Sequence, residues 1–237
     1  MYREILPVLI VVLMFSIAIY SEPRVTTNDK GEIPGNWNFA GKADGYVNKT
    51  VGIYLLPVIA LILYLSMLVI PKIDVYQKNL EEFDQQFWGF RVVLVFVMGA
   101  IYVATLLPSL GYWGNVDPVW IMVPAIALLF FYVGYMLNFT KRNYFIGVRT
   151  PWTLADEKIW EKTNHLASKL FWVCGVLTLV SLISPADFRL WIILLPVVLA
   201  AIIATLYSLY EYRKAKRHQA SESQRRAKGA KSRKGKR

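Results

Sequence analysis

Six stretches without a charged residue dominate this sequence of 237 residues. They comprise residues 5–20, 51–70, 92–113, 119–139, 170–186 and 190–210. The hydrocarbon core of a bilayer is about 30 Å thick, so a helix needs about 20 apolar residues to cross it. A hydrophobic content of 56% is also excessive for a single soluble domain of this length. We therefore predict an all-α fold, a polytopic protein of the cell (plasma) membrane with six transmembrane helices.

The distribution of Lys and Arg predicts the orientation, because cytoplasmic loops carry an excess of these residues. If the N-terminus is inside, 22 of the 27 Lys and Arg residues fall in inner segments, so both termini are cytoplasmic. The first stretch also resembles a signal peptide, with Arg3 before the apolar core and Ser16 and Ala18 near its end. We expect this stretch to be retained, because it stays apolar as far as Tyr20.

Polar segments divide the chain into four predicted parts. They are an N-terminal helical hairpin (1–70) with an outer polar loop (21–50), an inner amphipathic helix (71–91), a four-helix region (92–210) with a cytoplasmic loop (140–169), and a disordered basic tail (211–237). The outer loop contains four Gly and two Pro residues, which favour turns over regular structure.

The inner segments carry further signals. In residues 71–91, aromatic and Leu side chains recur at helical spacing, which predicts a helix that lies along the membrane interface. Asp156 is well placed as the N-cap of a helix that extends to about residue 184. From Arg213 onward the tail has twelve basic residues and one acidic residue, so we expect it to contact anionic lipid. Direct nucleic-acid binding is not expected, because no aromatic side chains are interleaved with these charges.

Asp, Glu, Lys, Arg and His are absent from the six stretches, which argues against an ion pump or a proton-coupled transporter. The only histidines, His165 and His218, lie in inner segments, and Cys174 is the only cysteine. No pair of these residues has the spacing of a transition-metal site. We also find no catalytic Ser/His/Asp set, and expect neither an enzyme nor a bound cofactor.

Four prolines lie near the predicted outer ends of their stretches: Pro57, Pro108, Pro124 and Pro196. A proline within a helix removes one hydrogen bond and bends the chain. Four bends at one depth would shape a vestibule that opens outward, as in a transporter or exporter of an apolar peptide or lipid. The alternative is that prolines near helix ends are simply tolerated.

The sequence NYFIGVRTPWTL (residues 143–154, the inner motif) interrupts the apolar pattern in the second inner loop. Gly147 permits a turn, and Pro151 prevents a helix from running through Thr150. Arg149 carries a planar cation suited to a carboxylate, a phosphate or helix-end carbonyl groups. From these residues alone, the motif either binds a partner or holds lipid headgroups at the interface.

The inner motif, followed by Trp160 and KTNH at 162–165, resembles the signature of the SdpI family. These are integral membrane immunity proteins against a secreted killing peptide of the sporulation-delay type. The sequence IPGNWNFAGKADGYVNK (residues 33–49, the outer motif) is similar to a short uncharacterised domain that often precedes the signature. Together the motifs and their spans cover most of residues 1–210.

The resemblance implies two sets of site residues. The cytoplasmic signature, which binds a partner or only shapes the fold, comprises Asn143, Gly147, Arg149, Thr150, Pro151, Trp152 and Trp160. The outer set, which would bind a ligand, comprises Pro34, Trp37, Asn38, Gly41 and Asp44. The sequence departs from the family pattern at Asn36, where His is frequent, and in its long basic tail.

The function implied by the resemblance is immunity combined with signalling. The protein would protect the membrane against a secreted toxic peptide outside and sequester a soluble transcriptional repressor at the inner face. Besides the transporter or exporter, a structural envelope-stress membrane protein, whose loops only anchor and assemble it, is an alternative. Membrane lipids are expected partners in each case.

Overall fold

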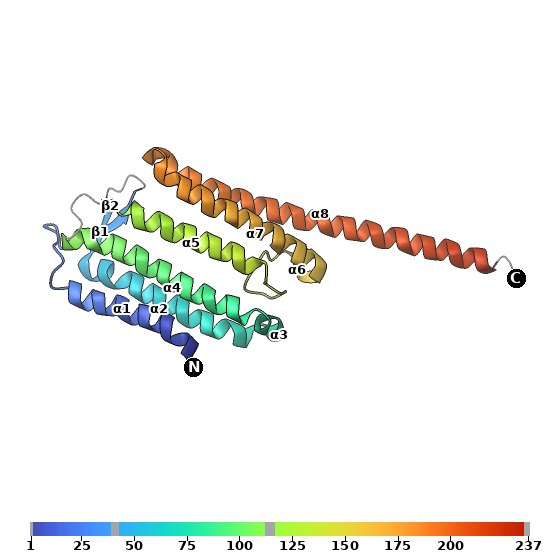
Figure 1. Ribbon diagram of the computed structural model, residues 1–237, viewed down its shortest axis with the longest axis horizontal. Coiled ribbons are helices and arrows are strands. Elements are labelled where there is room, and N and C mark those ends of the chain that lie inside the picture. The colour runs from blue at the N-terminus through green and yellow to red at the C-terminus, as the bar shows by residue number, and fades with distance from the viewer. Residues whose placement is uncertain (1, 39–42, 112–116, 235–237) are drawn as a thin grey trace.

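The computed structural model describes residues 2–38, 43–111 and 117–234, with side chains described through residue 222. Six long helices alternate in direction and form one bundle (Figure 1). They are α1 (Ile5–Ser21), α2 (Lys49–Ile73), α4 (Asp84–Leu106), α5 (Val119–Leu137), α7 (Glu157–Val180) and α8 (Ala186–Lys234). The shorter elements are η1 (Tyr2–Glu4), β1 (Glu32–Trp37), β2 (Ala43–Asn48), α3 (Gln77–Glu81), η2 (Leu107–Leu110), α6 (Pro151–Ala155) and η3 (Ser181–Ile183).

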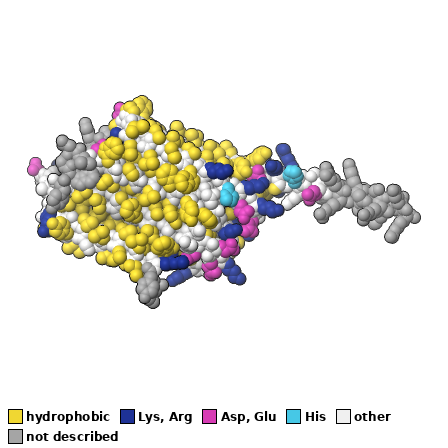
Figure 2. All heavy atoms as spheres, in the orientation of Figure 1, with side chains coloured by type: hydrophobic (Ala, Val, Ile, Leu, Met, Phe, Trp, Pro, Cys, Tyr) yellow, Lys and Arg dark blue, Asp and Glu magenta, His cyan; other side chains and the backbone are white. Residues whose placement is uncertain are grey.

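The surface of the bundle is apolar over the length of the helices, and charged side chains gather where α8 leaves the bundle (Figure 2). Leu13, Ile62 and Leu206, for example, are 58%, 59% and 60% exposed. Five helices are long and apolar enough to cross a membrane, and α1 is a shorter apolar helix of 17 residues. Since lipid is the medium that tolerates such a surface, the prediction of an all-α polytopic membrane protein is confirmed.

Neighbouring helices pack in the order α1 and α2 against α4, then α5, α7 and α8. The α5–α7 contact is close because Gly134 has no side chain. A Cβ atom at this position would lie 2.8 Å from the Trp172 ring and 3.0 Å from the carbonyl oxygen of Ser168. The Ser168 hydroxyl donates to the carbonyl oxygen of Gly134 at 2.6 Å, which adds a polar bond to the small-residue contact.

The polar loop 21–50 contains regular structure, so the prediction of turns alone is wrong. Strands β1 and β2 pair antiparallel, with Ile33 opposite Val47. An isolated hairpin of two strands is marginal in water, but this one buries Ile33 in a core that includes Ile53 of α2. Gly52 makes the contact possible, because a Cβ atom there would lie 2.7 Å from Cδ1 of Ile33.

Residues 71–91 do not form the single amphipathic helix predicted from their spacing. Instead α2 ends at Ile73, α3 is one short helix, and α4 has already begun at Asp84. The break is made by Asp74, which is 2% exposed. Its carboxylate accepts from the backbone N–H groups of Tyr76 at 2.7 Å and Tyr144 at 2.9 Å. A buried carboxylate that binds both segments favours the turn over a continuous helix.

The apolar side chains of this segment are buried in protein rather than along the membrane interface. Leu80, Phe83 and Phe87 form a core cluster with Met136 of α5 and Ile146 of the inner motif. The spacing therefore correctly indicated a stripe of apolar side chains. This stripe packs against α5 and the inner motif, however, and not against the membrane interface.

The prediction of a disordered tail is wrong for residues 211–234, which continue α8 to Lys234. This part of the sequence is rich in Ala, Lys, Arg and Gln, which have high helix propensity. The packed part of α8 supplies the nucleus, and each further residue then adds one hydrogen bond. The last turns of α8 extend well beyond the bundle (Figure 1).

The N-terminus is fixed to α4 by a charged cluster that sequence reasoning did not find. A carboxylate oxygen of Glu4 lies 3.1 Å from the guanidinium of Arg91, whose side chain is only 8% exposed. Glu4 also accepts from the hydroxyl of Tyr64 at 3.0 Å. We call this the Glu4–Arg91 cluster. The cluster connects the start of α1 to α2 and α4, at the end of the bundle opposite the β1–β2 hairpin.

Candidate functional site

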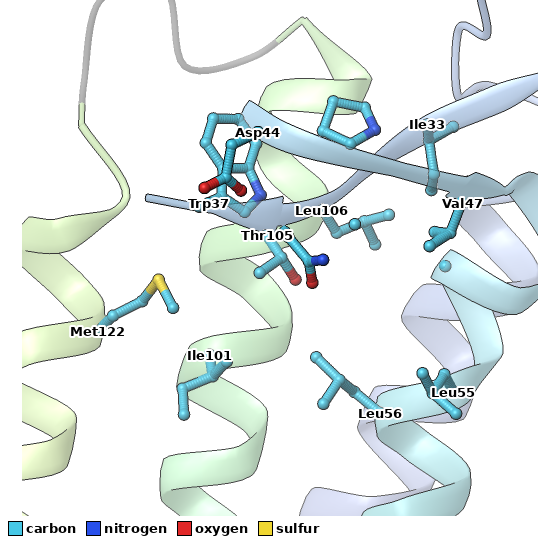
Figure 3. Close-up of a pocket in the computed structure, with 14 residues that line it drawn as sticks. Ile33, Trp37, Asp44, Val47, Leu55, Leu56, Ile101, Thr105, Leu106 and Met122 are labelled. Carbon is cyan, nitrogen blue, oxygen red and sulfur yellow. The ribbon is translucent and has the colours of Figure 1, made fainter. Parts of the chain in front are cut away.

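A cavity of about 610 Å³, the hairpin cavity, lies between the β1–β2 hairpin and the ends of α2, α4 and α5. Its helical wall is apolar, with Leu56 from α2, Ile101 from α4 and Met122 from α5 extending toward the space under the strands (Figure 3). Ile33 and Val47 contribute apolar side chains from the hairpin (Figure 3). A concave apolar site with few polar groups is the usual form of a ligand-binding pocket.

Two polar side chains of the outer motif lie together at one side of this cavity, Trp37 and Asp44 (Figure 3). Asp44 is exposed, so its carboxylate is accessible at the rim. The indole N–H of Trp37 is buried and has no hydrogen-bond partner among the described residues. An indole N–H is only a donor, so within the described ranges the side chain keeps one unused donor beside the cavity.

The structure brings together part of the predicted outer set. Pro34, Trp37 and Asp44 line the hairpin cavity, whereas Asn38 follows β1 and is not among the lining residues. Gly41 lies outside the described residues. Asn36, the position at which the family pattern often has His, also lines the cavity.

The four prolines predicted to shape a vestibule do not line this cavity. Pro57, Pro124 and Pro196 lie inside their helices, and Pro108 belongs to η2. The hollow at this end of the bundle is therefore made by the β1–β2 hairpin, which lies over the helices, and not by these four prolines.

Asn143 organises the inner motif at the opposite end of the bundle. It is fully buried, and its amide group donates to the carbonyl oxygens of Lys141 at 2.8 Å and Ile146 at 3.0 Å. Its side-chain oxygen accepts from the backbone N–H groups of Phe145 at 2.8 Å and Ile146 at 2.7 Å. The side chain thus uses all of its hydrogen-bonding capacity on its own loop.

Gly147 has a φ of +112°, which side-chain-bearing residues rarely adopt. A Cβ atom at this position would lie 2.7 Å from Oδ1 of Asn164 and 3.0 Å from the Trp160 ring. The glycine is thus required both by its backbone conformation and by its contact with α7.

Trp160 and Asn164 are the α7 side chains that receive the motif. Trp160 is fully buried and donates from Nε1 to the carbonyl oxygen of Thr140 at 2.8 Å. Asn164, 1% exposed, accepts from the backbone N–H of Val148 at 2.9 Å. Both are positioned because α7 begins at Glu157 with Asp156 as its N-cap, as the sequence predicted.

The end of the motif forms helix α6 and contacts α8. Thr150 and Thr153 make a reciprocal capping box, with Pro151 at the first helical position. The hydroxyl of Thr150 lies 3.1 Å from that of Ser208 in α8. Trp152 adds a tilted ring contact with Tyr212 of α8, at a centroid distance of 6.5 Å.

Arg149 differs from the other members of the predicted signature because its side chain is exposed and charged. Its guanidinium donates to the carbonyl oxygen of Tyr144 at 2.5 Å. Tyr144 is itself 45% exposed, and its ring stacks on Tyr76 at a centroid distance of 5.5 Å. The structure therefore separates a buried scaffold from a small exposed surface formed by Tyr144, Arg149 and Pro151.

Sequence reasoning did not single out three side chains that complete the inner motif: Asp74, Thr153 and Asn164. Two of them had a recognisable signal. Thr153 stands three residues after Thr150, which is the spacing of a capping box, and Asn164 lies one turn after Trp160 on the same helix face. Asp74 had none, because its partner Tyr144 is distant in sequence.

Within the described part of the chain, no group of three His, Cys, Asp or Glu side chains is arranged to hold a metal ion. The candidate sites in these residues are therefore two. At one end of the bundle the apolar hairpin cavity lies beside the indole N–H of Trp37, which is unpaired among the residues that the structure describes. At the opposite end the inner motif is held by internal hydrogen bonds.

Comparisons with known proteins match the segments that contain the inner motif and the outer motif. Residues 140–208 match the SdpI/YfhL protein family, and residues 9–61 match a domain of unknown function (DUF1648). Over 214 residues the chain is 32% identical to the immunity protein SdpI of Bacillus subtilis (strain 168), which covers 90% of this chain and 98% of that protein. No solved structure matches the chain.

Proposed function

This chain belongs to the SdpI family of multi-pass cell-membrane proteins, and from that premise we propose that it protects its cell against a secreted toxic peptide. The observation that carries the proposal is 32% identity to an immunity protein over 98% of that protein's length. The proposal assigns no catalytic step and no cofactor to the chain.

In the proposed topology all six long helices cross the membrane and both termini are cytoplasmic. The support is the location of 22 of the 27 Lys and Arg residues in the segments at one end of the bundle or in the tail. The hairpin cavity then faces the outside, where a secreted peptide arrives. The inner motif faces the cytoplasm.

The hairpin cavity is the proposed site for the toxic peptide. Its apolar wall would accept apolar side chains of a membrane-active peptide, with Trp37 and Asp44 at one side of the space. Occupation of this cavity would hold the peptide at the outer surface and away from the bilayer.

The proposed function is tested by expression of the chain in sensitive indicator cells that are exposed to a killing peptide of the sporulation-delay type. We expect survival to rise to that of cells that produce the Bacillus subtilis immunity protein, which serves as the reference. Death at the same peptide concentration as in empty cells, with normal amounts of the protein in the membrane, would contradict the proposal.

Signalling is the second element of the proposal, with a soluble transcriptional repressor held at the inner face. Tyr144, Arg149 and Pro151 are the exposed motif side chains that such a partner can reach, and Arg149 is the only charged one among them. Arg149 makes one exposed hydrogen bond, so its removal should cost less than about 1 kcal/mol of stability.

Replacement of Arg149 by Ala is therefore expected to abolish capture of the repressor while protection is maintained. The measurement is a crosslinking pull-down from native membranes, with Lys158→Ala as the control because it removes another exposed cation of the same loop. Equal capture by wild type and Arg149→Ala would leave the motif with a scaffold role only.

A further inference from the structure

One face of α8 changes from apolar to basic where the helix leaves the bundle. Leu206 and Tyr210 are 60% and 58% exposed. Arg213, Lys214 and Arg217 follow at steps of three and four residues and are exposed as well. Residues at this spacing share one side of a helix, so apolar and cationic side chains form one continuous strip.

A shallow groove runs along this strip. A groove of about 400 Å³ is lined by seven α8 residues between Leu206 and His218, and they include all five of the exposed residues named above. The groove thus begins among apolar side chains and ends among cations. We call it the α8 groove.

The cations of the α8 groove have no carboxylate partner among the side chains described. The nearest acid on the helix, Glu211, is 6% exposed and bound to Lys162 of α7 at 2.5 Å. Lys214 lies 5.9 Å above the ring of Tyr210 and makes no ion pair within the described residues. The groove itself is lined by no carboxylate from the described side chains, although Lys214 also borders a neighbouring hollow with Asp156 and Glu211. Because the three positive charges repel one another, binding of an anion in the groove is favoured.

We propose that the α8 groove binds one anionic phospholipid of the inner leaflet. Arg213, Lys214 and Arg217 would surround the phosphate, since guanidinium groups bind phosphate through paired hydrogen bonds. One acyl chain would lie along Leu206 and Tyr210. The strip is about 16 Å long at 1.5 Å per residue, which accommodates a headgroup and the upper part of a chain.

The lipid would support α8 at its weakest point. Apart from the loop at its start, α8 packs mainly on α7 and α6, and its basic part extends past them (Figure 1). A bound lipid would neutralise the mutual repulsion of the three cations. This proposal requires that the inner end of α8 faces the cytoplasm, but it does not depend on immunity.

The test is a titration of the purified full-length chain, monitored by native mass spectrometry, with phosphatidylglycerol and with phosphatidylcholine that carry the same acyl chains. We expect one phosphatidylglycerol to bind in preference to phosphatidylcholine. The triple variant Arg213→Gln, Lys214→Gln, Arg217→Gln should bind it about 100-fold more weakly, since each basic residue near the surface contributes about 1 kcal/mol.

The control variant Lys72→Gln, Lys78→Gln, Lys169→Gln removes the same charge from other exposed positions and should change the affinity by less than a factor of about three. Size-exclusion profiles of all variants check that they are folded. Equal binding of the two lipids, or an equal loss in the control, would overturn the proposal. Displacement of the lipid by equimolar glycerol 1-phosphate would also overturn it, because the apolar part of the groove would then contribute nothing.

Discussion

Replacement of Asn143 by Ala is expected to lower the free energy of unfolding by about 4 kcal/mol, because several loop groups lose their partners at once. The side chain makes four hydrogen bonds with lengths of 2.7 to 3.0 Å, and it is fully buried. With alanine at this position, two backbone N–H groups and two backbone carbonyl groups would lose their hydrogen bonds to the Asn143 side chain. The measurement is a dodecyl sulfate titration of the protein in mixed micelles.

Two variants sharpen this prediction. Asn138→Ala removes the same side chain from an exposed position, where its side-chain oxygen lies 2.8 Å from Nδ1 of His165, so it should cost less than about 1 kcal/mol. Asn143→Asp keeps both accepting bonds but directs an oxygen at two carbonyl groups, and it should be nearly as damaging as alanine. An unchanged unfolding midpoint for Asn143→Ala would show that the loop is held by other contacts.

Filling the hairpin cavity should abolish protection without loss of the protein from the membrane. Ile101→Trp and Met122→Trp each place an indole in the space that the peptide is proposed to occupy. We expect binding of the peptide to weaken at least tenfold, which corresponds to about 1.4 kcal/mol. Survival of indicator cells over a range of peptide concentrations provides the measurement.

The matched controls introduce the same side chain on the lipid-facing side of the same helices. Phe96 of α4 is 50% exposed and Leu128 of α5 is 39% exposed, so Phe96→Trp and Leu128→Trp should protect as wild type does. Full protection by both cavity variants would show that the peptide is recognised elsewhere. Loss of protection in the lipid-facing controls would show that tryptophan disturbs these helices in general.

The sequence predicts the helical bundle well, because membrane helices must satisfy their backbone hydrogen bonds internally and therefore appear as uninterrupted apolar stretches. Each of the six stretches falls largely in one long helix. The start of α7 was also predictable, since Asp156 accepts from the backbone N–H groups of Lys158 and Ile159 as an N-cap should.

The hairpin and the inner segment were mispredicted for a different reason. Their structure depends on contacts that no local pattern records. Ile33 finds its place on α2 only because Gly52 leaves room, and Asp74 ends α2 by binding a loop that is distant in sequence. Local composition therefore indicated turns in one case and a continuous helix in the other.

The inner motif was recognised from its order of residues, but the sequence did not indicate which of its side chains are buried and which are exposed. Asn143, Gly147 and Trp160 face inward and are explained by packing and hydrogen bonding, whereas Arg149 and Tyr144 are exposed. Because this loop has neither a helical nor a strand period, its residue order does not indicate which side chains turn inward. That distinction decides which substitutions test folding and which test partner binding.

The Glu4–Arg91 cluster has a consequence for biogenesis. Glu4 leaves the ribosome among the first residues, and Arg91 follows after about 4 to 17 s at synthesis rates of ~5–20 residues per second. During that interval the Glu4 carboxylate lacks its Arg91 partner, although Tyr64 is available earlier to donate a hydrogen bond to it. The ion pair at 3.1 Å can therefore form only once residue 91 has been synthesised, and it then joins the N-terminus to α4.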